Sequence, residues 1–366
     1  MKIIYFINRI SVSGGTKVLF QHLQLLRTRG IEAEVVTLKN ENLSFFGDNA
    51  RCFEKIELSN FDANLCVATK PADILALFDA GIHKKMPICH FIQGDEIGEL
   101  ETRISTLLDH EVYSLKFLGR LFKAVKYSRR KKLFAKAFRL PTVKMAVSKH
   151  LCNQVQERFQ EKCFEISNGI DLSVFSPSFC QKNKEGGKQW RIVSVGPFKV
   201  NTKGIDHVLG AVELLKSSGF PVHLSRIAGS PISAEEKHSG LVDSYYQAIP
   251  EREVVRIIQA SDIMVLGSLE EEGFGLPALE AMACKTPCVL TKIPAFLNLD
   301  EQRDFACFVP PRDPQAIADG VRKIIMNKEY RDGLEKRGFQ VAQNYSLDVL
   351  GDRLETFYSN LLGKNS

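Results

Sequence analysis

The sequence lacks several features that would place it in a specialised class of protein. No run of 18 apolar residues occurs among its 366 residues, and none of its nine cysteines forms a C-x-x-C pair. The first absence argues against a membrane-spanning helix, and the second against a zinc site or a disulfide framework. The apolar run at 3–7 is too short for the core of a signal peptide. We therefore expect reduced thiols, no bound metal and a cytoplasmic location.

Acidic residues are missing from one long segment, 112–156, which holds twelve lysines or arginines and no aspartate or glutamate. The net charge of the chain is +6, so the remaining residues sum to −6. Leucine and phenylalanine lie between these cations: Phe122 and Val125 share one helical face, as do Phe134 and Phe138. This pattern is typical of a basic amphipathic helix at an anionic membrane surface. An ordinary surface helix explains it equally well, and no nucleic-acid-binding motif accompanies it.

Strand and helix patterns alternate along both halves of the chain, which predicts parallel β-α-β units. The segment 175–189 has no periodicity and is polar, so it is the predicted linker. We expect an α/β fold with two doubly wound, Rossmann-like domains that face each other across a cleft, where such sheets bind ligands. The first domain comprises 1–177 together with the final helix, 346–366, which crosses back to it, and the second comprises 190–345.

The strongest local pattern follows a strand at 262–268. Glu272 precedes a turn containing Gly273 and Gly275, and a helix begins at about Leu276, with Glu280 one turn further on. The first amides of a helix have no intrahelical acceptor and lie at its positive end, and the glycines allow close approach, so this turn suits a phosphate. The alternative is that the glycines only turn the chain and that Glu280 is a solvated helix residue.

Two other turns could contribute to a ligand site. Lys199 and Lys203 lie in the loop after a strand that ends at Gly196, from which a lysine can reach a diphosphate. Gly14 and Gly15 follow the first strand and would let the backbone approach a ligand. They are not part of a G-x-G-x-x-G dinucleotide motif, so this second pattern is weak alone.

Together, these elements resemble those of the retaining glycosyltransferases with the GT-B fold, in particular family 4. The resemblance rests on the glycine pair Gly14-Gly15, on Lys203-Gly204, on the E-x7-E spacing of Glu272 and Glu280, and on the NGID sequence at 168–171. It extends over nearly the whole chain, and the E-x7-E element is its most specific part. The resemblance implies a transferase that moves a sugar from a nucleotide-sugar donor to an acceptor hydroxyl.

The resemblance also implies roles for individual residues. Glu280 would hold the nucleotide ribose, Glu272 would contact hydroxyls of the donor sugar, and Lys203 would neutralise the diphosphate together with amides of Phe274 to Leu276. Ile249 falls where the family packs the base. The implied catalytic residues are Glu272, Gln93 and Lys203. The implied donor-binding residues are Gly14, Gly15, Lys199, Lys203, Ile249, Gly273, Phe274, Gly275, Leu276 and Glu280.

The sequence departs from the family at two positions. Pro197 stands where the family has an arginine, and Lys199 or Arg226 are the candidates to replace its charge. Gln93 stands where the family often has a histidine, and His90 lies three residues earlier. Glutamine cannot act as a general base. In the mechanism usually proposed for the family, the departing phosphate takes the acceptor proton, so transfer does not require that histidine.

The resemblance predicts no cofactor besides the nucleotide-sugar co-substrate, and the absence of a D-x-D motif gives no support for a metal clamp. The implied acceptor is a cell-envelope glycan or glycolipid, as in lipopolysaccharide, capsule or exopolysaccharide assembly. A lipid-linked acceptor would suit a peripheral contact of 112–156 with the inner face of the cell membrane. The alternatives are a GT-B epimerase of nucleotide sugars and a non-catalytic protein that binds them.

Overall fold

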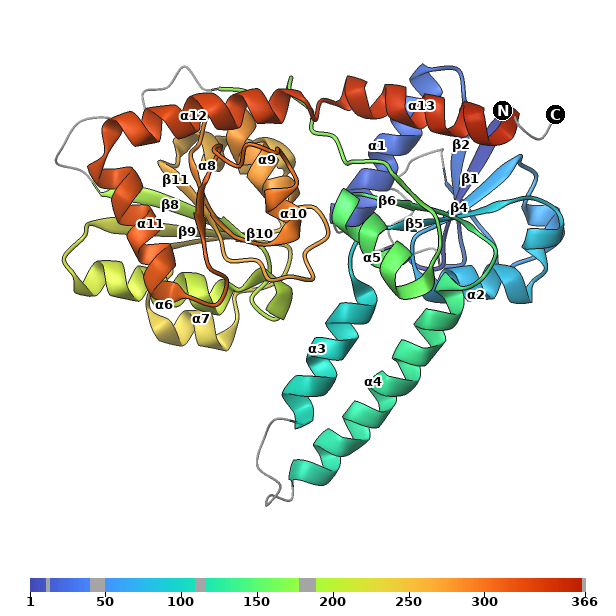
Figure 1. The fold of residues 1–366 in the computed structure, drawn as a ribbon, viewed down its shortest axis with the longest axis horizontal. Coiled ribbons are helices and arrows are strands. Elements are labelled where there is room, and N and C mark those ends of the chain that lie inside the picture. Colours follow the sequence, from blue (N-terminus) through green and yellow to red (C-terminus); the bar gives the residue numbers. More distant parts are fainter. Residues whose placement is uncertain (11–13, 40–49, 109–115, 178–188, 364–366) are drawn as a thin grey trace. The chain divides into compact units, whose positions relative to one another are not determined.

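The computed structural model describes residues 1–10, 14–39, 50–108, 116–177 and 189–363. The chain divides into two units, the first formed by Met1–Ser167 with the C-terminal segment from Leu350, and the second by Asn168–Val349 (Figure 1). Each unit contains one parallel sheet with helices packed on it, so the predicted pair of Rossmann-like α/β domains is confirmed.

The first unit is built on a seven-stranded parallel sheet in the order β3-β2-β1-β4-β5-β6-β7. Its central strands β1, β4 and β5 are almost fully buried, because helices cover the sheet, and their sequences are correspondingly apolar throughout. The elements are β1 (Lys2–Ile7), α1 (Gly14–Thr28), β2 (Glu32–Thr37), β3 (Ala50–Cys52), β4 (Leu65–Ala68), α2 (Pro71–Asp79), β5 (Ile88–Ile92), α3 (Glu96–Leu108), α4 (Lys116–Phe138), β6 (Val143–Ala146), α5 (Lys149–Phe159) and β7 (Cys163–Glu165).

The second unit is built on a six-stranded parallel sheet in the order β10-β9-β8-β11-β12-β13. Its core joins Val208 and Leu215 of α6 to Val265 and Val289 of the sheet and Val321 of α11. The elements are β8 (Trp190–Val195), α6 (Ile205–Ser217), β9 (Val222–Ala228), α7 (Ala234–Ser239), β10 (Ser244–Gln247), α8 (Glu251–Ala260), β11 (Ile263–Leu266), α9 (Leu276–Ala283), β12 (Cys288–Thr291), α10 (Pro294–Leu297), β13 (Cys307–Val309), α11 (Pro314–Met326) and α12 (Lys328–Gln343).

The final helix, α13 (Leu347–Gly363), returns the chain to the first unit. Leu354 and Tyr358 are completely buried, and the hydroxyl of Tyr358 lies 2.9 Å from that of Tyr5 on β1. This buried contact between the fourth residue of a central strand and the last helix agrees with the predicted crossing.

The boundaries between the units differ from those expected from the linker. Ile170 donates its amide to the carbonyl of Tyr345 at 2.7 Å and accepts from the amide of Leu347 at 3.1 Å. Ser176 accepts a hydrogen bond from the side chain of Gln259 on α8 at 2.8 Å. These contacts hold 168–176 to the second unit. The second unit therefore begins at Asn168, and not at residue 190 after the linker. Most of that linker, 178–188, lies outside the described residues.

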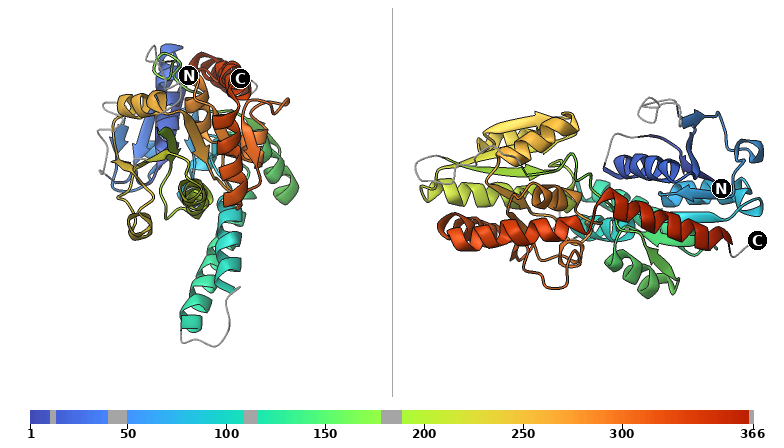
Figure 2. Two further views of the ribbon diagram at one scale, coloured as in Figure 1. Left: turned by 90° about the vertical axis from the view of Figure 1, so that its left-hand side faces the viewer. Right: turned by 90° about the horizontal axis from the view of Figure 1, so that it is seen from above.

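Helices α3 and α4 form an antiparallel hairpin that projects from the sheet of the first unit (Figures 1 and 2). The structure shows which of the two predicted apolar pairs of the basic segment is buried. Phe134 and Phe138 are buried, whereas Phe122 is 75% exposed and Val125 is 44% exposed. The two pairs therefore lie on different sides of α4: Phe134 and Phe138 pack inside the fold, and Phe122 and Val125 do not.

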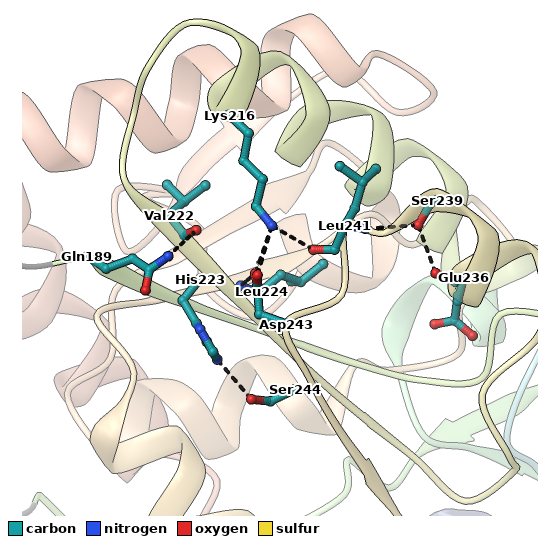
Figure 3. A network of polar contacts seen from close by, with 10 residues as sticks. All are labelled: Gln189, Lys216, Val222, His223, Leu224, Glu236, Ser239, Leu241, Asp243 and Ser244. Carbon is teal, nitrogen blue, oxygen red and sulfur yellow. Dashed lines mark hydrogen bonds and ion pairs between the residues drawn. The ribbon is translucent and has the colours of Figure 1, made fainter.

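Edge strand β10 of the second unit is held in the sheet by polar contacts in addition to its ladder (Figure 3). Asp243, just before β10, accepts the amide of Leu224 at 2.7 Å and an ion pair from Lys216 at 2.9 Å. His223 Nε2 lies 2.9 Å from the hydroxyl of Ser244. The contacts fix the register of a strand whose sequence has no apolar run.

Three properties can be stated for the described part of the chain. None of its helices is long and apolar enough to span a membrane. It contains no group of three or more histidine, cysteine, aspartate or glutamate side chains placed to hold a metal ion. The eight cysteines within it are free thiols.

Candidate functional site

The loop between β8 and α6 is shaped by two glycines that bring Lys203 against the end of β11. Gly196 has a φ of +130°, and a Cβ there would lie 3.0 Å from Cγ of Lys203. Gly204 has a φ of +54°, and a Cβ there would lie 1.9 Å from the carbonyl oxygen of Gly267. Only glycine fits both positions. The amide of Leu269 also donates to the carbonyl of Thr202 at 2.8 Å, which ties the lysine loop to the loop after β11.

Lys203 and Glu272 form the ion pair at the centre of this site. Nζ of Lys203 lies 2.7 Å from Oε2 of Glu272, and the two side chains are 26% and 11% exposed. The residues are 69 positions apart in sequence but come together because β8 and β11 are neighbouring strands whose carboxyl ends share one edge of the sheet. The structure thus brings together two of the three predicted catalytic residues.

The turn into α9 is rigidly packed. Gly275, the residue before the helix, has a φ of +87°, and a Cβ there would lie 2.3 Å from the ring of Phe296. Phe274 is 5% exposed and packs edge-on against Tyr345, with 5.7 Å between ring centroids. Gly273 is also buried, and Leu276 is the first helical residue. The N-terminal amides of α9 are therefore held in place before any ligand binds.

Glu280 lies one turn inside α9 and is 8% exposed. A carboxylate is rarely buried to this degree without polar contacts. The alternative of a solvated surface glutamate is therefore wrong. Glu272, the turn and Glu280 all belong to the connection that leaves β11, and they place two carboxylates on either side of a helix N-terminus.

Arg226 is not a replacement for the arginine expected at Pro197. Its side chain is completely buried and donates to the carbonyls of Ser194 and Gly196, at 2.7 and 2.5 Å, and to Glu236 at 3.1 Å. The guanidinium is thus used to support the end of β8 from within the fold. Lys199 is exposed in the loop between β8 and α6.

Ile249, the predicted base contact, is half-buried in the connection from β10 to α8. The preceding residue, Ala248, has a φ of +47°, and its amide donates to the carbonyl of Ala228 at the end of β9 at 2.9 Å. A non-glycine residue with positive φ is uncommon, so the fold holds this loop in a defined conformation. Ile249 is therefore fixed at the same carboxyl-terminal edge as the lysine loop.

In the first unit, the glycine pair and Gln93 meet. Gly14 and Gly15 begin α1, and Gln93 directly follows β5. Nε2 of Gln93 donates to the carbonyl of Gly15 at 3.4 Å, and a Cβ at Gly15 would lie 2.2 Å from Oε1 of Gln93. A side chain at position 15 would therefore displace the end of the Gln93 side chain.

His90, the alternative to Gln93, is a core residue of the first unit. It is completely buried on β5, and its ring centroid lies 4.7 Å from that of Phe138. Burial, together with the charge of Lys144, lowers the pKa of His90 to about 3. A neutral, inward-facing imidazole cannot contact a ligand at the edge of the sheet.

Two carboxyl groups that the sequence analysis did not identify lie after neighbouring strands of the first sheet. Asp73, in the first turn of α2, is 2% exposed and accepts the amide of Asn8 at 3.4 Å. Glu96 is the first residue of α3, and its Oε2 is buried with no hydrogen-bond partner among the described residues. Burial raises the pKa of Asp73 to about 6 and that of Glu96 to about 8. The signal was present, since both are acidic residues within five positions of a strand end.

We expect Glu96→Gln to change how the stability of the protein depends on pH. The pKa of Glu96 rises from 4.5 to about 8 on folding, mainly through burial. The folded state therefore holds a proton that the unfolded state releases, so this stabilisation is present below pH 4.5 and is lost as pH rises to about 8. Glu96→Gln should leave the melting temperature unchanged near pH 4.5 and raise it by a few degrees at pH 8.

Thermal unfolding monitored by circular dichroism at a series of pH values measures this effect. Glu157→Gln, at an exposed position of the same unit, is the matched control and should change neither value. Equal melting temperatures of wild type and Glu96→Gln at pH 8 would show that folding does not raise the pKa of Glu96.

The second unit therefore combines a cation, a helix that begins after a glycine N-cap and two carboxylates in one strand-helix connection. Lys203 and the amides before α9 can neutralise phosphate oxygens. Carboxylates such as Glu272 and Glu280 accept hydrogen bonds from hydroxyl groups. This combination fits a ligand with a diphosphate between two hydroxyl-bearing groups.

Residues 176–341 match the family described as "Glycosyl transferases group 1". Among curated proteins, the chain is 30% identical over 167 residues to a GDP-mannose-dependent alpha-(1-6)-phosphatidylinositol dimannoside mannosyltransferase of Mycobacterium tuberculosis, over 44% of this chain and 43% of that protein. It is 31% identical over 128 residues to a D-inositol 3-phosphate glycosyltransferase of Corynebacterium urealyticum, over 35% of this chain and 30% of that protein. The chain thus spans less than half the length of these relatives.

Solved structures match over the whole length. The sucrose-phosphate synthase of Thermosynechococcus elongatus has a TM-score of 0.77 at 16% identity, covering 100% of both chains. Anabaena HepE, in complex with UDP-glucose, has a TM-score of 0.75 at 14% identity, covering 98% of this chain and 100% of that one. These matches show the fold.

Proposed function

We propose that this chain, a GT-B protein with a glycosyl transferases group 1 region at residues 176–341, transfers a sugar from a nucleotide-sugar donor to an acceptor hydroxyl and retains the anomeric configuration. The observation that carries the proposal is the Lys203–Glu272 ion pair beside the N-terminus of α9, with Glu280 one turn inside that helix. Comparable support comes from the complex of HepE with UDP-glucose, which has the same fold.

In the proposed complex, the diphosphate of the donor lies between Lys203 and the amides at Phe274 to Leu276. Glu280 accepts hydrogen bonds from the ribose, and Ile249 packs against the base. Glu272 exchanges its contact with Lys203 for hydroxyls of the donor sugar. Lys203 is then free to contact the phosphate. The ion pair should therefore favour binding of the complete nucleotide sugar over binding of the free diphosphate.

Charge neutralisation by Lys203 and by backbone dipoles supports a reaction that needs no metal ion. The bond between the anomeric carbon and the leaving oxygen breaks while the acceptor oxygen attacks from the same face. The departing phosphate takes the acceptor proton. Gln93 and the carbonyl of Gly15 are then a positioning pair that donates and accepts hydrogen bonds without moving a proton.

The proposed acceptor is a cell-envelope glycan or glycolipid. This part of the proposal is supported by the names of relatives, which include a phosphatidylinositol dimannoside mannosyltransferase and the capsular polysaccharide biosynthesis glycosyltransferase CapM of Staphylococcus aureus, 25% identical over 215 residues. Peripheral contact of the basic segment with an anionic membrane would bring the enzyme to a lipid-linked acceptor.

Calorimetric titration of UDP, GDP, ADP and dTDP, followed by incubation with the matching nucleotide sugars, tests the proposal. We expect one diphosphate to bind and its sugar donor to be hydrolysed slowly without an acceptor, with the released sugar first appearing as the anomer present in the donor. Conversion of the donor to an epimer would indicate an epimerase. Binding without turnover, even with envelope glycan extracts and after chelation or addition of metal, would indicate a non-catalytic binding protein.

A further inference from the structure

The side of α4 that faces away from α3 carries exposed apolar residues and cations together. Leu121 is 41% exposed, Phe122 75%, Val125 44% and Leu133 49%, although each is a residue type that is usually buried. We call this surface the outer face of α4, and it consists of Leu121, Phe122, Val125, Arg129, Lys132, Leu133 and Lys136, all exposed.

The opposite side of α4 packs within the first unit. Ala124, Phe134, Ala137 and Phe138 are buried, at 4%, 6%, 0% and 4% exposure. The helix therefore already has an apolar stripe that accounts for its packing. Its outer face is a second apolar stripe that the fold of the unit does not use.

The charge of the hairpin is not balanced on that face. Among the described residues of α4, Lys131 is the cation with an ion pair to an acidic side chain, at 3.2 Å from Glu101. Glu101 also faces Arg158 at 3.7 Å, and Glu99 is paired to Arg103. Glu99 and Glu101 of α3 are thus engaged, and the cations of the outer face are left for a partner.

We propose that the outer face of α4 docks on an anionic phospholipid bilayer, with Leu121, Phe122 and Val125 entering the boundary between headgroups and acyl chains. A soluble polyanion would pair with the cations but leave these apolar side chains in water. A second copy of the chain would cover the apolar residues but bring two cationic faces together. A bilayer with anionic headgroups satisfies both groups at once.

The direction of α4 agrees with this mode of docking. The helix begins at the far end of the hairpin and runs back to β6 at the sheet (Figure 1). Leu121, Phe122 and Val125 lie in the half farther from the sheet, whereas Arg129, Lys132 and Lys136 lie nearer to it. The far half enters the bilayer boundary, and the nearer cations contact lipid phosphates. The inference deepens the proposed function, since it names the surface through which a lipid-linked acceptor would be reached.

Flotation of the full chain with vesicles tests the apolar contact. We expect the protein to float with phosphatidylcholine vesicles containing 30% phosphatidylglycerol, a composition chosen for the assay, and not with pure phosphatidylcholine. Phe122→Ser should weaken binding about tenfold or more, because it removes a phenylalanine side chain that the bilayer would bury. Met326→Ser is the matched control: Met326 is also 75% exposed but lies on α11 of the second unit, and its replacement should have no effect.

A second set of variants tests the cations. Arg129→Glu/Lys132→Glu/Lys136→Glu should reduce binding by roughly 100-fold or more, and added salt should weaken the wild type in the same direction. Arg130 and Lys131 are left unchanged, because they contact Phe134 and Glu101 within the fold. Lys55→Glu/Lys84→Glu, at exposed positions of the same unit outside the hairpin, should retain binding.

Insertion can be detected separately from adsorption. Trp190 is the single tryptophan of the chain, so Phe122→Trp gives the protein a second indole. Its emission should shift to the blue with anionic vesicles and be quenched by brominated acyl chains, with the wild type as the background. Loss of quenching with retained flotation would overturn the insertion. Wild type that ignores anionic vesicles, binds soluble polyphosphate equally well, or instead dimerises in sedimentation velocity would overturn the bilayer as partner.

These outcomes are independent of catalysis. Calorimetry with the nucleoside diphosphate should give the same affinity for all hairpin variants, since Lys203, the α9 turn and Glu280 lie in the second unit. Vesicle binding by a protein that shows no transfer would leave the docking inference standing while the proposed function fails. Transfer to a soluble acceptor by a protein that ignores vesicles would do the reverse.

Discussion

Lys203→Ala is expected to lower kcat/KM for sugar transfer by about 100- to 1,000-fold, the loss typical of removing one group that stabilises developing charge. The resemblance places Pro197 where an arginine is expected, and Arg226 is held inside the fold by carbonyls at the end of β8. Lys203 is consequently the cation that the structure places next to the α9 turn, 2.7 Å from Glu272. Its loss should leave the diphosphate to backbone amides alone.

Lys199→Ala tests the other predicted donor-binding cation of this loop, whose side chain is exposed. We expect it to change kcat/KM less than about threefold, in the range of an exposed charge. Lys203→Arg is the conservative variant, and it should restore only part of the activity. A planar guanidinium is larger than an ammonium group and cannot place its charge at the position of Nζ, 2.7 Å from Oε2 of Glu272.

A purely structural role for the ion pair predicts a different result. In that case Lys203→Ala would lower the melting temperature, and Lys203→Ala/Glu272→Ala would recover both stability and turnover. We expect the double variant to remain inactive, because both groups contact the donor. Recovery of transfer by the double variant would contradict the proposed roles.

The strands at the centre of both sheets could be predicted from sequence because they are apolar runs. The strands at all four sheet edges, β3, β7, β10 and β13, could not be predicted. Each has three or four residues; β3, β7 and β10 are not continuous apolar runs, and the apolar run of β13 is only three residues long. An edge strand has a neighbour on one side only, so its sequence carries little of the pattern that identifies a buried strand. Contacts such as that of Asp243 with Leu224, which hold β10, join positions 19 residues apart.

The candidate site shows the same division. The turn at Gly273 and Gly275 and the spacing of Glu272 and Glu280 could be predicted, since they lie within one strand-helix connection. The partner of Lys203 could not be predicted from its surroundings, because the pair depends on β8 and β11 being neighbours. Arg226 was a candidate ligand for phosphate in the sequence, and only the structure shows its side chain with 0% exposure against Glu236.

The basic segment illustrates a further limit. Periodicity identifies apolar faces, but it does not say which of two faces the fold covers. Phe134 and Phe122 both lie on apolar faces of the same helix, yet one is 6% and the other 75% exposed. The choice depends on α3, which was not predicted as a separate helix and which packs on one side of α4.

Separate replacement of Glu272 and of Glu280 by glutamine should distinguish donor binding from turnover. Glu280→Gln should weaken binding of the free nucleoside diphosphate by about 1.5–3 kcal/mol, the range for a hydrogen bond to a charged group. Glu272→Gln should leave that affinity within about threefold of wild type, because the sugar it contacts is absent from the free diphosphate. Its kcat for the complete donor should fall by about 100-fold.

The measurement is calorimetry with the free diphosphate and steady-state kinetics with the nucleotide sugar on the same preparations. The physical reason for the split is position: Glu280 is fixed on α9 at 8% exposure, whereas Glu272 precedes the turn and can exchange Lys203 for a sugar hydroxyl. Glutamine keeps the size of each side chain and removes its charge, so the helix packing around Met282 and Phe296 should survive. Equal losses of diphosphate affinity in the two variants would mean that both carboxylates hold the nucleotide, and the sugar would then need another partner.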